Sequence, residues 1–354
     1  MYKLLSVILL SLILTSCYSR MVTRVTDENL VIFPAPPDTA RIQFLTSISN
    51  SIDITGQRSG FMEYILGKDE GMPIIKPYGL SIHKGKIYIS DTMLGGLVII
   101  DLKKHTFSYF EPGGRGQLKK PINCFVDDRG YLFVADAERK EVVVFDNNLK
   151  YVRSLGNAKT GKPTDVFVAG DKIWICDINA HKVLVYSRDN YELVNSFPDV
   201  DPQHENFLSS PTNLFVTGDK VYVSDFGSFK IKVYTTSGTY LRSIGSYGKA
   251  LGQFVRPKGI AVDRNDNLYV VDAGFENVQI FNKDDKLLMF FGGNYEGRGN
   301  MWLPAKVILD YDNLQYFQKY VHKDFKLKHL IFVTNQYGPD KLNVYGFIEL
   351  KSKK

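Results

Sequence analysis

The feature that most constrains the fold of this chain is an internal repeat that occurs six times. Each copy contains a proline, and the prolines at positions 77, 121, 163, 211, 257 and 304 are 44, 42, 48, 46 and 47 residues apart. In the first five copies an aspartate follows the proline by 14 or 15 residues and ends a run of β-forming residues. Such regularity indicates a stack of similar structural units rather than one irregular core. The aspartates are Asp91, Asp136, Asp177, Asp225 and Asp272.

Each copy has the pattern of short β-strands joined by turns, with four strands in a complete unit. In the fifth copy, β-forming runs at 259–262, 268–271, 278–281 and 287–291 are separated by polar segments such as 264–267. A four-stranded unit with a period in the forties is typical of a propeller blade, which buries its faces only against neighbouring blades. The sequence therefore predicts an all-β, six-bladed β-propeller over residues 41–354.

The fifth copy also resembles the NHL repeat. The resemblance is carried by Gly252–Asp263, which reads GQFVRPKGIAVD, and by Asn267–Ala273, which reads NLYVVDA. It extends from about residue 75 to the C-terminus and implies a propeller fold. Members of that family bind proteins or nucleic acids and in some cases are enzymes, so the resemblance implies no single function.

The last copy lacks a fourth strand of its own. After the third predicted strand, Lys341–Ile348, the sequence ends within a few residues and would leave an exposed sheet edge. Upstream of the first copy, Arg41–Ile48 reads as a strand that belongs to no blade. We expect this strand to complete the last blade and close the ring, with residues 17–40 as a tether.

The sixth copy carries an insert between its first and second predicted strands. Within it, Asn313–Val321 has apolar residues at helical spacing, and Asp312 or Asn313 is a suitable N-cap. We expect a short amphipathic helix that packs on its own domain rather than on a membrane.

The N-terminus has the order of a secretory signal: a lysine at position 3, an apolar run at 4–14, and then Thr-Ser-Cys. The run is too short for a transmembrane helix, which needs about 20 residues. Leu14–Cys17 resembles the bacterial lipobox, which implies removal of residues 1–16 and attachment of lipid, including palmitate, to Cys17. The following Tyr18, where inner-membrane lipoproteins have aspartate, implies the outer membrane. An ordinary secretory peptide with an incidental cysteine is the alternative.

Composition narrows the remaining possibilities. The net charge of +6 is spread along the chain without a long basic run, so nucleic acid is not expected as a partner. Cys124 and Cys176 lie in apolar strand patterns, which predicts buried thiols.

Candidate ligand-binding residues come from the repeat geometry. The first strand of a blade is innermost, so the residue two after each proline should surround the mouth of the central channel. Three of these residues offer oxygen ligands, which suit a polar ligand or Ca²⁺. Alternatively they cap their own backbone turns, and the lysine in the ring opposes a cation. The six are Gly79, Asn123, Asp165, Asn213, Gly259 and Lys306, and His181 lies in a loop on the same predicted face.

Two functional hypotheses follow. The recurring aspartates read as turn-stabilising residues, and the sequence shows no nucleophile motif, phosphate-binding loop or zinc-ligand spacing, so no catalytic residue is assigned. The first hypothesis is a lipid-anchored cell-envelope platform that binds a protein or glycan and needs no cofactor. The alternative is a lactonase-like hydrolase or lyase with a metal at Asn123, Asp165 and Asn213 and His181 as base.

Overall fold

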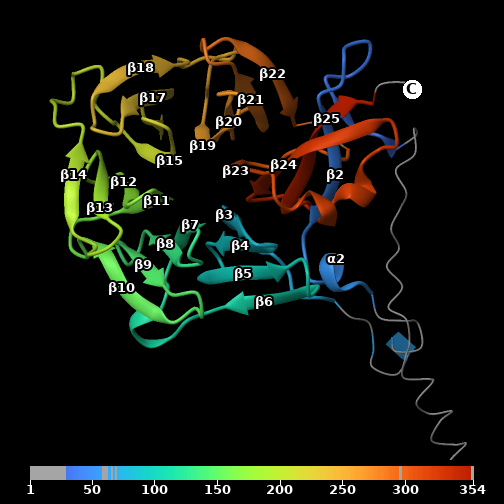
Figure 1. Ribbon diagram of the computed structural model, residues 1–354, viewed down its shortest axis with the longest axis horizontal. Helices are drawn as coiled ribbons and strands as arrows, with labels where there is room; N and C mark the ends of the chain where they lie inside the picture. The colour runs from blue at the N-terminus through green and yellow to red at the C-terminus, as the bar shows by residue number, and fades with distance from the viewer. Residues whose placement is uncertain (1–28, 58–62, 65–66, 68–69, 295–296, 352–354) are drawn as a thin grey trace, which may run out of the picture.

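The computed structural model describes residues 29–57, 63–64, 67, 70–294 and 297–351. Six antiparallel β-sheets are arranged as a ring around a common axis (Figure 1). The chain is an all-β, six-bladed β-propeller, which confirms the predicted fold. Cys17 and the predicted signal peptide lie outside the described residues. No helix among the residues described above is long and apolar enough to cross a membrane.

Blades 1 to 5 each consist of four consecutive strands, numbered outward from the axis. Blade 1 contains β3 (Pro77–His83), β4 (Lys86–Asp91), β5 (Gly96–Asp101) and β6 (Thr106–Phe110). Blade 2 contains β7 (Pro121–Val126), β8 (Leu132–Asp136), β9 (Glu141–Phe145) and β10 (Tyr151–Gly156). Blade 3 contains β11 (Pro163–Ala169), β12 (Lys172–Asp177), β13 (Lys182–Ser187) and β14 (Leu193–Phe197). Blade 4 contains β15 (Pro211–Thr217), β16 (Lys220–Asp225), β17 (Lys230–Thr235) and β18 (Tyr240–Ile244). Blade 5 contains β19 (Pro257–Val262), β20 (Leu268–Asp272), β21 (Asn277–Phe281) and β22 (Leu287–Gly292).

In blades 1 to 5 the recurring proline and aspartate face each other at the open end of the hairpin formed by the first two strands. Each innermost strand begins at its proline, and that proline pairs with the aspartate that ends the second strand. In blade 1, Asp91 accepts hydrogen bonds from the backbone N–H groups of Ile75 and Lys76 at 2.7 and 2.9 Å, and from two further N–H groups in the next turn. These aspartates are therefore structural, as predicted. In blade 6 the equivalent residue is Asn335, whose Oδ1 accepts a 3.2 Å bond from the backbone N–H of Trp302.

Blade 6 is built from both ends of the chain. Its inner strands are β23 (Pro304–Asp310), β24 (Phe325–Asn335) and β25 (Leu342–Leu350), and its outer strands are β2 (Ile42–Ile48) and β1 (Ile32–Phe33). Strand β2 pairs antiparallel with β25, with Ile42 opposite Phe347 and Ile48 opposite Leu342. The predicted closing strand is confirmed. Part of the segment expected as a tether is instead β1, which pairs with β2.

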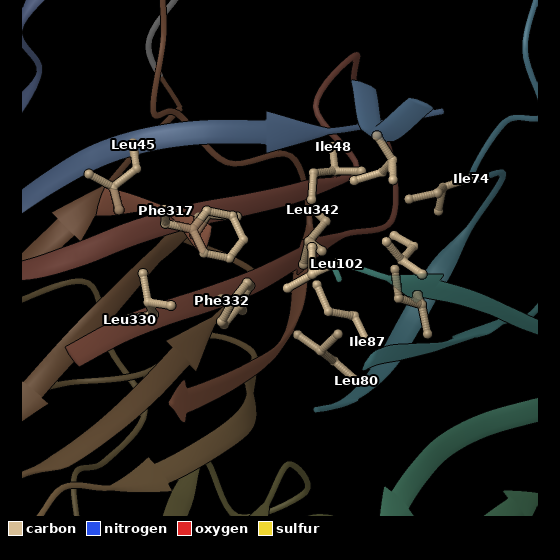
Figure 2. Close-up of a cluster of buried hydrophobic side chains, with 14 of the residues drawn as sticks. Leu45, Ile48, Ile74, Leu80, Ile87, Leu102, Phe317, Leu330, Phe332 and Leu342 are labelled. Atoms are coloured by element: carbon tan, nitrogen blue, oxygen red, sulfur yellow. The ribbon is translucent and has the colours of Figure 1, made fainter. Parts of the chain in front are cut away.

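The ring is sealed by an apolar core between its last and first blades (Figure 2). Leu45 and Ile48 of β2 lie in one buried cluster with Leu330 and Phe332 of β24 and Leu342 of β25. The same cluster includes residues of blade 1 and its neighbourhood, among them Ile74, Leu80, Ile87 and Leu102. Residues far apart in sequence thus close the ring by burying apolar surface.

The insert of blade 6 differs from the prediction. Instead of one α-helix over Asn313–Val321, it forms two 3₁₀ turns, η3 (Leu314–Tyr316) and η4 (Gln318–Tyr320). The predicted N-cap bond is absent, because neither candidate side chain bonds the turn in the described structure and Asn313 instead bonds Asp310. Phe317 is buried in the seam between blades 6 and 1, so the insert packs on its own domain as expected.

Candidate functional site

The six innermost strands approach each other closely around the axis. A Cβ atom on Gly79 would lie 2.4 Å from Cα of Asn123 in the next blade, and one on Gly259 would lie 2.6 Å from Cα of Lys306. Only glycine fits at these two positions, because the contact is with backbone that cannot move aside. The residues two after each proline therefore meet, but deeper than predicted. Asn123, Asp165 and Asn213 have no exposed surface, so they form a buried constriction rather than an open mouth.

An ion pair fills this constriction. The ammonium of Lys306 lies 2.6 Å from Oδ2 of Asp165, and both side chains are buried. The same carboxylate oxygen accepts a hydrogen bond from the backbone N–H of Leu214 at 3.0 Å and from the Asn213 amide at 3.3 Å. Its other oxygen accepts a 3.0 Å bond from the N–H of Val166. Asp165 is thus neutralised and bonded at both oxygens.

The two asparagines complete the constriction from adjacent blades. The Asn123 amide donates a 2.7 Å hydrogen bond to the carbonyl of Thr164 in blade 3. The side-chain oxygens of Asn123 and Asn213 accept no hydrogen bond from the described residues. Both oxygens therefore keep unused acceptor capacity. Of the predicted candidate residues, Asn123, Asp165 and Asn213 lie together, and only the histidine lies elsewhere.

His181 lies away from the other candidates. Its Nδ1 is 3.0 Å from the carbonyl oxygens of Leu208 and Ser209, and its ring centroid lies 5.0 Å from that of Phe207. These contacts connect the loops of blades 3 and 4. The described part of the chain contains no group of three His, Cys, Asp or Glu side chains arranged to hold a metal. The thiols of Cys124 and Cys176 are buried and free, as predicted, and burial raises the pKa of Cys124 to about 11.

Beyond the ion pair the channel widens into an apolar cavity of about 260 Å³. It extends from Lys306 towards the C-terminal ends of the innermost strands, where Ile82, Val262 and Tyr311 line it. We call the disk face with the turns after the innermost strands the turn face. We call the opposite one, with the loops before Pro77 and its counterparts, the proline face. Because Lys306 and Asp165 fill one end of the channel, the cavity is accessible from the turn face.

Three phenylalanines form one wall of this cavity. Phe125, Phe167 and Phe215 occupy the same position in blades 2, 3 and 4, four residues after the proline. Their ring centroids are 4.6 Å apart for the first pair and 5.0 Å for the second, distances at which aromatic rings attract. All three rings remain partly exposed. The sequence analysis did not single out these three residues and missed this wall.

Comparison with known proteins gives the fold and no assigned activity. Residues 201–353 match the model of a family described as "6-bladed beta-propeller". No curated protein matches the sequence. A Xanthomonas campestris gluconolactonase structure is similar with a TM-score of 0.58 and 16% identity, over 94% of this chain and 99% of that chain. The likeness is one of fold.

Two further solved structures give the same result. A structural genomics protein from Bacteroides thetaiotaomicron has a TM-score of 0.59 and 15% identity, over 87% of this chain and 76% of that chain. Virginiamycin B lyase from Staphylococcus aureus has a TM-score of 0.54 and 13% identity, over 79% and 86% of the two chains. The propeller architecture is therefore shared by proteins of different activities, and identities this low carry no residue roles.

Proposed function

We propose that this propeller is a lipid-anchored binding protein of the bacterial cell envelope. In this proposal Cys17 carries the lipid, and the central channel receives an apolar group of a ligand or protein partner at the turn face. The resemblance of Gly252–Asp263 to the NHL repeat supports a binding role, since propellers of that family present their loop faces to partners.

The apolar cavity is the observation that carries this proposal. Small-molecule sites are mainly apolar concavities of roughly 300–1,000 Å³ with a few polar groups that fix orientation. This cavity, at about 260 Å³, lies just below that range and has one polar end, at Lys306. A volume of this size suits a single ring or short branched chain rather than an extended ligand. Phe125, Phe167 and Phe215 would provide the contact surface.

A metal-dependent hydrolase or lyase remains the second candidate, because similar propellers include a lyase and a gluconolactonase. Its predicted ligand Asp165 is, however, bound to Lys306, so a cation would first have to displace a buried ammonium. Ca²⁺ or Zn²⁺ that raises the melting temperature of the wild type, but not of Asp165→Asn, would support this candidate.

Titration with a naphthalene-based fluorescent probe tests the channel. We expect saturable one-to-one binding that Phe167→Gln weakens roughly tenfold, because the substitution removes an aromatic contact from the wall. Phe290→Gln is the matched control, since Phe290 lies on an outer strand and is 43% exposed. Equal weakening by both variants, or no saturable binding to the wild type, would contradict the proposed role of the channel.

The anchor is tested separately in bacterial cells. Labelled palmitate should be incorporated into the wild type, and the protein should fractionate with the outer membrane. Cys17→Ser should abolish both results, whereas Cys124→Ser, which changes a buried thiol, should retain the label. Palmitate incorporation into Cys17→Ser would refute the lipoprotein assignment.

A further inference from the structure

Three cationic side chains gather on the proline face above blade 6. Lys76 of blade 1 and Arg256 of blade 5 immediately precede the prolines that begin their innermost strands, and Lys258 follows Pro257. Strands β19 and β3 both contact β23, so blades 5 and 1 flank blade 6. Blade 6 has only a buried alanine, Ala305, at the position equivalent to Lys258.

No carboxylate of the described residues neutralises these cations. Lys76, Arg256 and Lys258 form no salt bridge with any residue that the structure describes, whereas Lys120 and Lys182 on the same face each pair with an acid. Burial of Lys258, followed by the nearby charges of Arg256 and Lys76, lowers the pKa of Lys258 to about 8. Such clustering of like charges is unfavourable in the free protein and would be relieved by a bound anion.

Aromatic rings border the cations. The Lys258 ammonium lies 5.0 Å from the ring centroid of Tyr78. The Lys76 ammonium lies 4.8 Å from the ring centroid of Tyr337 and donates a 2.9 Å hydrogen bond to its hydroxyl. Tyr337 is 52% exposed, and the neighbouring Trp302 is 38% exposed. Exposed aromatic rings next to unpaired cations provide an apolar surface and charge in one place.

We propose that Lys76, Arg256 and Lys258, with Tyr337 and Trp302, form a binding site for an anionic saccharide whose sugar rings carry carboxylates. The carboxylates pair with the cations, and Arg256 can bind one of them through two parallel hydrogen bonds. The C–H face of a sugar ring lies against an aromatic face, whose negative quadrupole attracts it. Inorganic phosphate would satisfy the cations but leave both exposed rings uncovered. The site is separate from the apolar cavity, which opens on the turn face.

Calorimetric titration of the purified full-length chain with trigalacturonate tests the site. We expect saturable binding to the wild type and at least roughly tenfold weaker binding to the double variant Lys76→Gln/Lys258→Gln, which loses two charged contacts. The control is Lys104→Gln, which removes the charge of an exposed lysine on the turn face and should bind like the wild type. Tyr337→Ala should weaken binding while keeping every charge.

Further probes separate this ligand from other anions. Maltotriose, which lacks carboxylates, should bind at least tenfold more weakly than trigalacturonate, and phosphate should compete only weakly. The proposal is overturned if the wild type does not bind trigalacturonate, if the double variant binds it equally well, or if maltotriose binds as tightly. Binding to vesicles with anionic lipid but not to trigalacturonate would overturn it in favour of a membrane surface. The naphthalene probe is unaffected by these substitutions if the two sites are separate.

Discussion

Lys306 and Asp165 are each other's counter-ion at the centre of the ring, 2.6 Å apart and contributed by blades 6 and 3. The pair spans the channel between opposite blades, and the backbone N–H groups of Val166 and Leu214 fix the carboxylate from two further directions. One interaction thus joins elements on opposite sides of the axis and separates the apolar cavity from the proline face.

Removal of one partner should therefore destabilise the propeller strongly. We expect Asp165→Asn to lower the free energy of unfolding by about 3–5 kcal/mol, because Lys306 keeps a buried charge without a partner. The double variant Asp165→Asn/Lys306→Met should recover most of this loss, since no charge remains in the constriction. Denaturant unfolding of the single and double variants measures the difference. If the double variant is no more stable than Asp165→Asn, the loss of stability does not come from the unpaired charge of Lys306, and this explanation is wrong.

The glycines of the constriction offer a test of the close strand approach. Gly79→Ala should cost at least about 3 kcal/mol, because its Cβ would lie 2.4 Å from Cα of Asn123 and strands would have to separate. Gly113→Ala is the control: nothing lies within 4 Å of its Cβ, and its φ of −97° suits any residue. We expect that control to change stability by no more than about 0.5 kcal/mol. Thermal or denaturant unfolding that ranks the two variants equally would contradict this explanation.

The closing strand should contribute core stability and not only sheet pairing. Ile42 of β2 has no exposed surface and lies in a cluster between blades 5 and 6. Ile42→Ala should cost about 2–5 kcal/mol, as for other fully buried aliphatic residues. Val152→Ala, at a 39% exposed position on the outer strand of blade 2, should cost much less. Comparison of their unfolding midpoints at equal m-values measures the effect, and equal midpoints would disprove a structural role for β2.

Acid should weaken the last blade through His329. Burial lowers its pKa to about 4 from the usual 6.5, and its ring stacks on Phe347 at 4.9 Å. Between those pH values the unfolded chain binds a proton that the folded chain does not, so stability falls as pH decreases from 6.5 to 4. His329→Phe should reduce that loss by up to about 3 kcal/mol. The free energy of unfolding of both proteins is measured at pH 7, 5.5 and 4. If it falls by the same amount in the wild type and in His329→Phe, His329 is not responsible.

The proposed saccharide site should depend on pH in the alkaline range. Because the pKa of Lys258 is about 8, its ammonium is lost in the free protein as pH rises from 7 to 9. Affinity for trigalacturonate should therefore decrease over that range in the wild type. Lys258→Gln should show weaker binding with little dependence on pH between 7 and 9. A wild type with constant affinity across this range would exclude Lys258 from the site.

The fold was largely predictable because each blade repeats the same local signals. Proline at the start of the first strand and aspartate at the end of the second pair with each other, and this pairing recurs in the same register in other blades. Even the closing strand followed from a simple count, since the last blade lacked one strand. The insert was misjudged because helical spacing of Leu314, Phe317 and Val321 is also satisfied by two 3₁₀ turns that bury Phe317.

The site was only half predictable. Their position in the repeat correctly predicted that Asn123, Asp165 and Asn213 lie close together. It did not predict how deep in the channel they lie. Because they are buried, they form a constriction inside the channel rather than an open mouth. The three phenylalanines four residues after their prolines were visible in the sequence. The sequence did not show that these phenylalanines line the channel. A side chain on an innermost strand faces either a neighbouring blade or the channel, and only the packing in the folded protein shows which. The cations above blade 6 come from two repeats, and their proximity depends on ring closure.

The order of synthesis has a consequence for a ring closed in this way. Strand β2 is synthesised before blades 1 to 5, whereas its partner β25 is synthesised after them. Blades 1 to 5 each contain all of their own strands and can form their local pairings during synthesis. Until β25 has been synthesised, β2 can pair only with the short strand β1, and blades 1 and 6 cannot bury their shared core. A chain cut short before β25 would therefore remain an open arc with unpaired edges, a form that quality-control proteases and chaperones recognise.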